Sequence, residues 1–166
     1  MTQARGPKVP NTDTVPLAPI TPQAAPSGSD EAGTKNAAAV GACVAKMSCA
    51  NVDGTGVEWL GADISNMDFS FAQLVGVDLR GVNAANTSFA GANLSGANLA
   101  GANLSGASFS GADLPGANLT NADLSGANLR GANLAGAIIV GADFQAAFYC
   151  ETTWPDGTLR TGQCER

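Results

Sequence analysis

A residue pattern with a period of five runs through most of this chain. Counting every fifth position from Ile64 to Trp154 gives 19 units, and Ala84 is the only small residue among their centres. The position two residues before the centre is Ala in 14 of the 19 units. The position two residues after the first 18 centres is Gly in 12 units and Asn in three. Gly and Asn tolerate positive φ angles, so the pattern predicts one turn in every unit.

A period of five excludes an ordinary helix and favours a solenoid of very short strands. Gly at every fifth position of a helix would cost about 1 kcal/mol each relative to Ala, and five matches neither 3.6 nor a heptad. Alternation along a strand places the centre and the residue two before it on one face, and we expect both to point inward. The residue between them should face outward, and the uncharged columns there, such as Asn98 and Asn118, are expected to form side-chain ladders.

The spacing of the aromatic centres predicts how many units close one coil. Phe69, Phe89, Phe109 and Tyr149 lie at multiples of 20 residues from one another, with Leu129 between the last two. Four units per coil would stack these side chains in one column. With stacked strands ~4.8 Å apart, the repeats would form about 4.75 coils in a rod roughly 23 Å long.

The consecutive units resemble a known repeat family. The run AnLsGAnLaGAnLsG at residues 92–106 is similar to the A-(D/N)-L-x-x signature of the pentapeptide-repeat family, and the resemblance extends over residues 62–154. It implies an all-β fold, a right-handed quadrilateral β-helix. The resemblance does not by itself imply an activity, and none of the repeats is a catalytic motif.

The segments outside the repeats are expected to be an arm and two caps. Residues 1–36 hold six of the eight prolines, which predicts a disordered arm that acts either as a linker or as a docking element. Residues 37–61 are expected to cap the N-terminal end, with a short helix over Asn36–Met47. Residues 155–166 are expected to cap the C-terminal end behind Trp154, because a Pro-Asp-Gly turn after the last repeats resembles a closing segment of the family.

Composition excludes several classes of function. The 166 residues include no His, which removes imidazole bases, His-activated nucleophiles and His-ligated metals. A net charge of −6 argues against direct binding of a nucleic-acid backbone. No apolar run reaches the ~18 residues of a membrane span. We therefore expect no catalysis, no cofactor and no bound metal.

The four cysteines form two local pairs in the sequence. We expect disulfides Cys43–Cys49 and Cys150–Cys164, because a rigid rod keeps its two ends apart. Two disulfides would favour an exported protein, in the periplasm or outside the cell. Free thiols in a cytoplasmic protein are the alternative, and a zinc site would need all four sulfurs to converge.

The function expected from these features is that of a non-catalytic scaffold that binds a protein partner or a larger assembly. Ile138 and Val140 flank the centre Ile139, and Phe148 occupies a normally polar outward position, so these three side chains are the candidate interface. The contact could use the rod surface, the C-terminal coils or the arm. An exposed apolar cluster at the C-terminal coils would also allow a homodimer.

The alternative function is mimicry of DNA. Some pentapeptide-repeat proteins resemble duplex DNA and bind a type II topoisomerase such as gyrase. The candidate carboxylate column is Asp63, Asp123 and Asp143, interrupted by Asn83 and Asn103. Residues 62–149 carry six acids and two arginines, a net charge of −4. Duplex DNA of ~23 Å carries on the order of 13 charges, so the sequence favours the scaffold.

Overall fold

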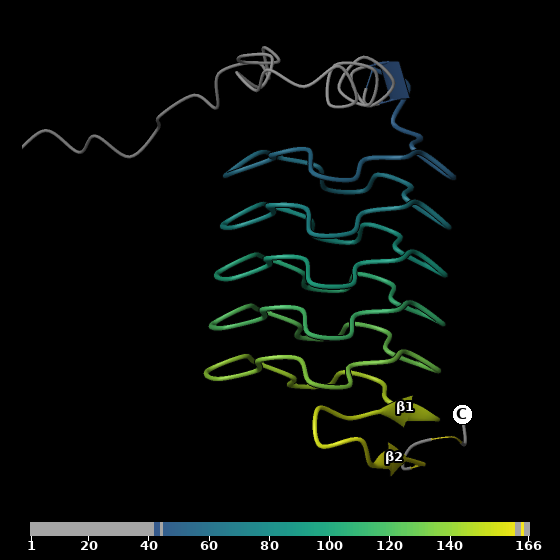
Figure 1. Ribbon diagram of the computed structural model, residues 1–166, viewed down its shortest axis with the longest axis vertical. Coiled ribbons are helices and arrows are strands. Elements are labelled where there is room, and N and C mark those ends of the chain that lie inside the picture. Colours follow the sequence, from purple (N-terminus) through teal and green to yellow (C-terminus); the bar gives the residue numbers. More distant parts are fainter. Residues whose placement is uncertain (1–41, 44, 162–163, 165–166) are drawn as a thin grey trace, which may run out of the picture.

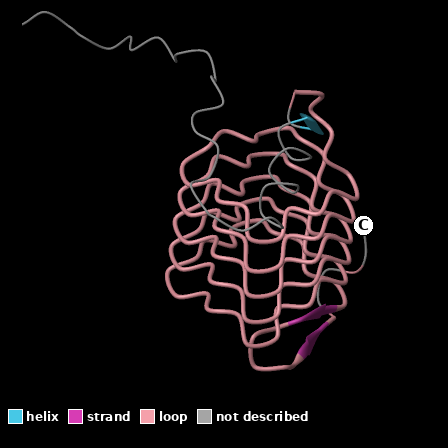
Figure 2. Ribbon diagram, turned by 45° about the horizontal axis from the view of Figure 1, so that its top comes forward, coloured by secondary structure: helices cyan, strands magenta, loops and turns pink. Residues whose placement is uncertain are grey.

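The computed structural model describes residues 42–43, 45–161 and 164. The expected disordered arm at residues 1–36 lies outside the described residues, as does most of the helix expected at residues 36–47. Residues 42–43 are helical, and the chain then enters a stack of coils (Figures 1 and 2).

Each coil consists of four five-residue units, as the aromatic spacing predicted. Parallel backbone bridges join residues 20 apart, from Ser48↔Asp68 to Asn133↔Thr153. They form four ladders, which we name by their first members. These are the Ser48 ladder (48, 68, 88, 108, 128, 148), the Asp53 ladder (53, 73, 93, 113, 133, 153), the Glu58 ladder (58, 78, 98, 118, 138) and the Asp63 ladder (63, 83, 103, 123, 143). Residues ten apart in sequence therefore lie on opposite faces of the coil.

The ladders begin earlier than the sequence pattern suggested. Ser48 already pairs with Asp68, so residues 48–61 belong to the coils instead of forming a separate cap. The centres of the first two of these units are Cys49 and Gly54, both buried, and a search for large apolar centres misses them. The third unit has the buried Trp59 as its centre. The corner residues of these early units have the same left-handed conformation as later ones, since Asn51 has a φ of 59° and Gly56 a φ of 70°.

The core is built from the two inward positions of each unit. Leu104 and Ala102 are typical, with exposed fractions of 0% and 1%, which confirms the predicted inward register. The rings of Phe69, Phe89 and Phe109 stack in one column, with centroids 5.6 and 5.2 Å apart. Burying this continuous apolar column is the main force that holds the coils together.

Backbone hydrogen bonds repeat in the same register from coil to coil. The N–H of Leu104 donates to the carbonyl of Asp123 at 2.7 Å, and the N–H of Asn103 donates to the carbonyl of Val82 at 2.9 Å. At the corner, the N–H of Gly106 donates to the carbonyl of Ser125 at 2.8 Å. The corner residue holds a positive φ in unit after unit, which is why Gly and Asn recur there.

A small hairpin follows the last coil. Strand β1 (Thr152–Thr153) pairs antiparallel with strand β2 (Leu159–Arg160). The turn between them uses Asp156, whose Oδ1 accepts a hydrogen bond from the N–H of Thr158 at 2.9 Å, and Gly157, with a φ of 79°. An Asp side chain that caps its own turn and a Gly at positive φ are typical of such turns.

Candidate interaction surface

An Asp or Asn side chain at the outward position before a centre accepts a hydrogen bond from the backbone of the corner that follows it. Oδ1 of Asp63 accepts the N–H of Ser65 at 3.0 Å, and Oδ1 of Asn103 accepts the N–H of Ser105 at 3.1 Å. This local bond explains why Asp and Asn are favoured at that position of the repeat. The backbone N–H of Ser65 holds the pKa of Asp63 below its ordinary value, so the carboxylate is charged at neutral pH.

Side-chain ladders occur on some faces but not where we expected them. The amide of Asn83 donates to Asp63 at 3.1 Å, and the amide of Asn103 donates to Asn83 at 3.1 Å. At Asn98 and Asn118 the side-chain oxygen instead accepts the backbone N–H two residues on. These two side chains stabilise their own turns, and the expectation of a ladder at these two residues was wrong.

The first full coil carries a ring of carboxylates. Asp53, Glu58, Asp63 and Asp68 occupy consecutive outward positions, one on each of the four ladders. From residue 83 to residue 108 the same position holds only Asn or Ser. The N-terminal end of the rod is therefore acidic on all sides, and the middle is neutral.

The candidate mimicry column does lie on one ladder. Asp63, Asp123 and Asp143 all belong to the Asp63 ladder, with Asn83 and Asn103 between the first two. The amide of Asn83 is bonded to Asp63, so this part of the column is a polar chain rather than a row of phosphate-like charges.

The three candidate interface residues do not form one cluster. Ile138 and Val140 face solvent, with exposed fractions of 50% and 70%. Phe148 is half-buried and belongs to the Ser48 ladder, on the opposite face of the coil from Ile138 in the Glu58 ladder. Grouping Phe148 with the other two was wrong, because ten residues amount to half a coil.

A larger apolar feature lies at the C-terminal end, where the last coil has no further coil to cover it. Its inward side chains Ile139, Phe144, Tyr149 and Trp154 are only half-buried. The Trp154 ring lies 5.2 Å from that of Phe144 and 5.9 Å from that of Tyr149. These rings, together with Ile138 and Val140, make an apolar end that we call the C-terminal end surface.

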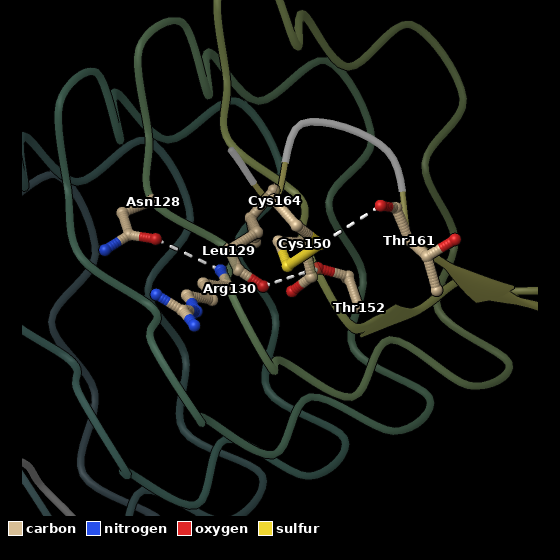
Figure 3. Close-up of a disulfide and its surroundings, with 7 residues drawn as sticks. All are labelled: Asn128, Leu129, Arg130, Cys150, Thr152, Thr161 and Cys164. Carbon is tan, nitrogen blue, oxygen red and sulfur yellow. Dashed lines mark hydrogen bonds between the residues drawn. A yellow bond between two sulfur atoms is a disulfide. The ribbon is translucent and has the colours of Figure 1, made fainter. Parts of the chain in front are cut away.

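Both predicted cysteine pairs are joined. Cys43 is bonded to Cys49, and Cys150 is bonded to Cys164 (Figure 3). The second disulfide ties the segment after β2 back to the last coil, beside the bond from the Thr152 hydroxyl to the carbonyl of Leu129. The four sulfurs are thus unavailable as zinc-binding thiolates.

The described part of the chain shows neither a metal centre nor a membrane span. It contains no group of three or more Cys, Asp or Glu residues placed to hold a metal ion. None of its helical residues forms a segment long and apolar enough to cross a membrane.

Comparison with known proteins agrees with this architecture. The family model for pentapeptide repeats matches residues 45–83, 79–121 and 112–147, with eight copies. The chain belongs to the pentapeptide-repeat family. The pentapeptide-repeat proteins of known structure that resemble this chain imply a right-handed quadrilateral β-helix. Its relatives in the family are generally non-enzymatic structural or interaction proteins.

Two solved structures illustrate the likeness. HetL, a pentapeptide repeat protein involved in heterocyst differentiation regulation in the cyanobacterium Nostoc sp. strain PCC 7120, is 34% identical with a TM-score of 0.66. The match covers 68% of this chain and 53% of HetL, so the chain spans about half the length of that protein. A pentapeptide repeat protein of the Arabidopsis thaliana thylakoid lumen is 29% identical, with a TM-score of 0.45 and coverage of 70% and 72%. No protein with a curated function matches the chain.

Proposed function

We propose that this protein is a non-catalytic scaffold that binds a protein partner through its C-terminal end surface, and that one such partner is a second copy of itself. The observation that carries the proposal is the half-buried state of the last inward side chains. Ile64, Leu104 and Leu134 are 0–1% exposed in their coils, whereas Ile139 and Phe144 are not fully covered. Covering them would bury apolar area, which favours association.

The backbone at this end supports the same proposal. In every earlier coil the N–H of the centre donates to a carbonyl of the next coil, as Leu119 does to Ile138. Within the described residues, the N–H groups of Ile139 and Phe144 have no such carbonyl. An open edge of this kind pairs readily with another chain.

The two ends of the rod differ in charge, and this favours contact between like C-terminal ends. The four carboxylates of the first coil would repel a second acidic ring and would be desolvated against an apolar surface. Of the four outward positions of the last coil, 138, 143, 148 and 153, only Asp143 carries a carboxylate, and the Arg160 guanidinium lies 5.5 Å from the centre of the Trp154 ring. Two C-terminal ends therefore meet at a lower electrostatic cost than two acidic rings. A twofold contact of this kind is the commonest form of homodimer.

The test is the oligomeric state of matched variants across a concentration series, measured by sedimentation equilibrium. The double variant Ile138→Asn and Val140→Thr restores the residues found one coil earlier, Asn118 and Thr120. We expect the native chain to dimerise and this variant to dissociate. Leu60→Thr is the control, because Leu60 is 64% exposed in the same corner column as Val140 but at the other end. A native chain that stays monomeric, or a variant that dimerises equally well, would contradict the homodimer.

We also propose that the protein works in an oxidising compartment outside the cytoplasm. The two disulfides support this, since such bonds persist in exported proteins and are rare in the cytosol. Thiol alkylation in intact native cells, without prior reduction, should leave all four cysteines unmodified. Alkylation of the cysteines would place the protein in a reducing compartment.

A further inference from the structure

A second surface, independent of the C-terminal end, centres on Phe71. This residue occupies a corner position that is Asn51 one coil earlier and Gly91 one coil later. Its φ is 60°, and 62% of the residue is exposed. The fold imposes this left-handed conformation at every corner, on Ala146 and Glu151 as well, so the unusual feature here is a large aromatic side chain at a position that otherwise favours Gly or Asn.

This strained backbone conformation does not bury the Phe71 side chain, which stays on the surface. Its ring lies over the next corner, where Cδ1 and Cε1 come within 2.6 Å of the point at which residue 91 would carry a Cβ atom. Gly91 is therefore the residue that leaves room for the ring. The exposed aromatic side chain is thus held in a fixed place along the corner instead of being buried in the core.

The surroundings of Phe71 combine apolar and acidic groups. Val75, at the other edge of the same face, is 37% exposed. The carboxylates of Asp53 and Asp68 lie on the two faces that meet at the Phe71 corner. The side chain and N–H of Ser70 hold the pKa of Asp68 below its ordinary value, so it is charged at neutral pH.

Basic groups do not neutralise this region within the described residues. Residues 45–80 hold five acids and only two bases, Lys46 and Arg80. The Arg80 guanidinium is already paired with Asp78 at 2.6 Å, at a different corner. A ligand that covers Phe71 therefore meets uncompensated negative charge on both sides.

We propose that Phe71 and Val75, flanked by Asp53 and Asp68, form a docking surface for a basic protein segment that carries an exposed apolar side chain. The aromatic ring supplies the anchor, as aromatic residues commonly do at interfaces. The carboxylates select Lys or Arg on either side of the apolar residue and steer the segment to the surface.

The test is selection of random displayed peptides on the immobilised full-length protein. Enriched peptides should carry an apolar residue next to Lys or Arg, and their affinity should fall as salt is raised. Phe71→Asn should weaken them at least tenfold, and Leu60→Thr, which changes an exposed residue at the opposite corner, should leave them unchanged. Acidic or uncharged peptides, peptides that bind Phe71→Asn equally well, or no enrichment would overturn the proposal.

Two further measurements separate docking from a structural role. Phe71→Asn places at this corner the residue found at position 51, which has a φ of 59°, so its melting temperature should be no lower than that of the native chain. A clear drop would show that Phe71 serves the fold. Benzoylphenylalanine at position 71 of the full chain should crosslink to a selected basic peptide. An intramolecular crosslink to residues 1–41 would show that the chain covers its own surface, and would overturn the proposal.

Discussion

The hydroxyl of Thr87 donates a hydrogen bond of 2.7 Å to the carbonyl oxygen of Ile64, which lies 23 residues earlier in the preceding coil. Thr152 makes the same contact with Leu129 at 2.6 Å. Both threonines are fully buried at a position that is Ala in most units. A buried hydroxyl needs such a partner, and here it joins two coils.

We expect Thr87→Val to lower the free energy of unfolding by about 1–2 kcal/mol, because it removes the hydroxyl and leaves a methyl group facing the carbonyl. Valine itself fits this kind of position, since Val77 and Val82 are fully buried at its equivalents. Denaturant unfolding measures the change. Thr55→Val, on the exposed surface, is the control and should change stability by no more than about 0.5 kcal/mol. Equal stability of Thr87→Val and the native chain would show that the bond contributes nothing.

Leu104→Asp should unfold the rod, because it buries a charge without a partner in the middle of the core. Leu60→Asp is the matched control, since Leu60 is 64% exposed and its replacement should leave the far-ultraviolet circular dichroism unchanged. Thermal unfolding of both variants decides the matter. A folded Leu104→Asp with native melting behaviour would mean that the inward register is wrong.

Acid should destabilise the protein through the turn-locking aspartates. Hydrogen bonds from Ser65, Ser70 and Ser125 lower the pKa values of the aspartates two residues before them, Asp63, Asp68 and Asp123, from the ordinary 3.8. A depressed folded-state pKa gives a stabilisation that is present above the unfolded value and is lost as the pH falls through the folded value. The melting temperature should therefore fall below about pH 4.

The control for this acid effect is to replace all three aspartates by Asn. The Asn side chain keeps the accepting oxygen, as Asn103 and Asn118 show, but does not titrate. The triple variant should lose less stability between pH 5 and pH 3 than the native chain. Identical acid profiles would assign the pH dependence to other groups.

Removing the C-terminal disulfide by Cys150→Ser and Cys164→Ser should lower stability by about 3 kcal/mol, because the bond closes a loop with a sequence separation of 14 residues. The N-terminal pair, with a separation of six, should contribute somewhat less, about 2 kcal/mol. Thermal unfolding of each double variant, with and without reductant, measures both. A reductant that changes neither melting temperature would contradict the prediction.

The candidate surfaces show where inference from the sequence fell short. The 20-residue coil period was available, and it already places Ile138 and Phe148 on opposite faces. The exposure of Phe71 could not be inferred in the same way, because an aromatic residue at a glycine corner could equally have turned inward. The first two units were missed because their centres, Cys49 and Gly54, lack the large apolar side chain that marks the other units, and the unit centred on Trp59 was assigned to the cap with them.

The sequence by itself determined the repeat unit, the inward register, the four units per coil and the local cysteine pairs. Each follows from short-range chemistry: Gly and Asn permit the left-handed corner, Asp and Asn lock it, and large apolar residues must be buried. Only the tertiary structure decided where the ladders begin, which hydroxyl meets which carbonyl one coil away, and how far the last aromatic side chains stay uncovered. Those features depend on stacking between coils, where a side chain's environment is set by residues about 20 positions away.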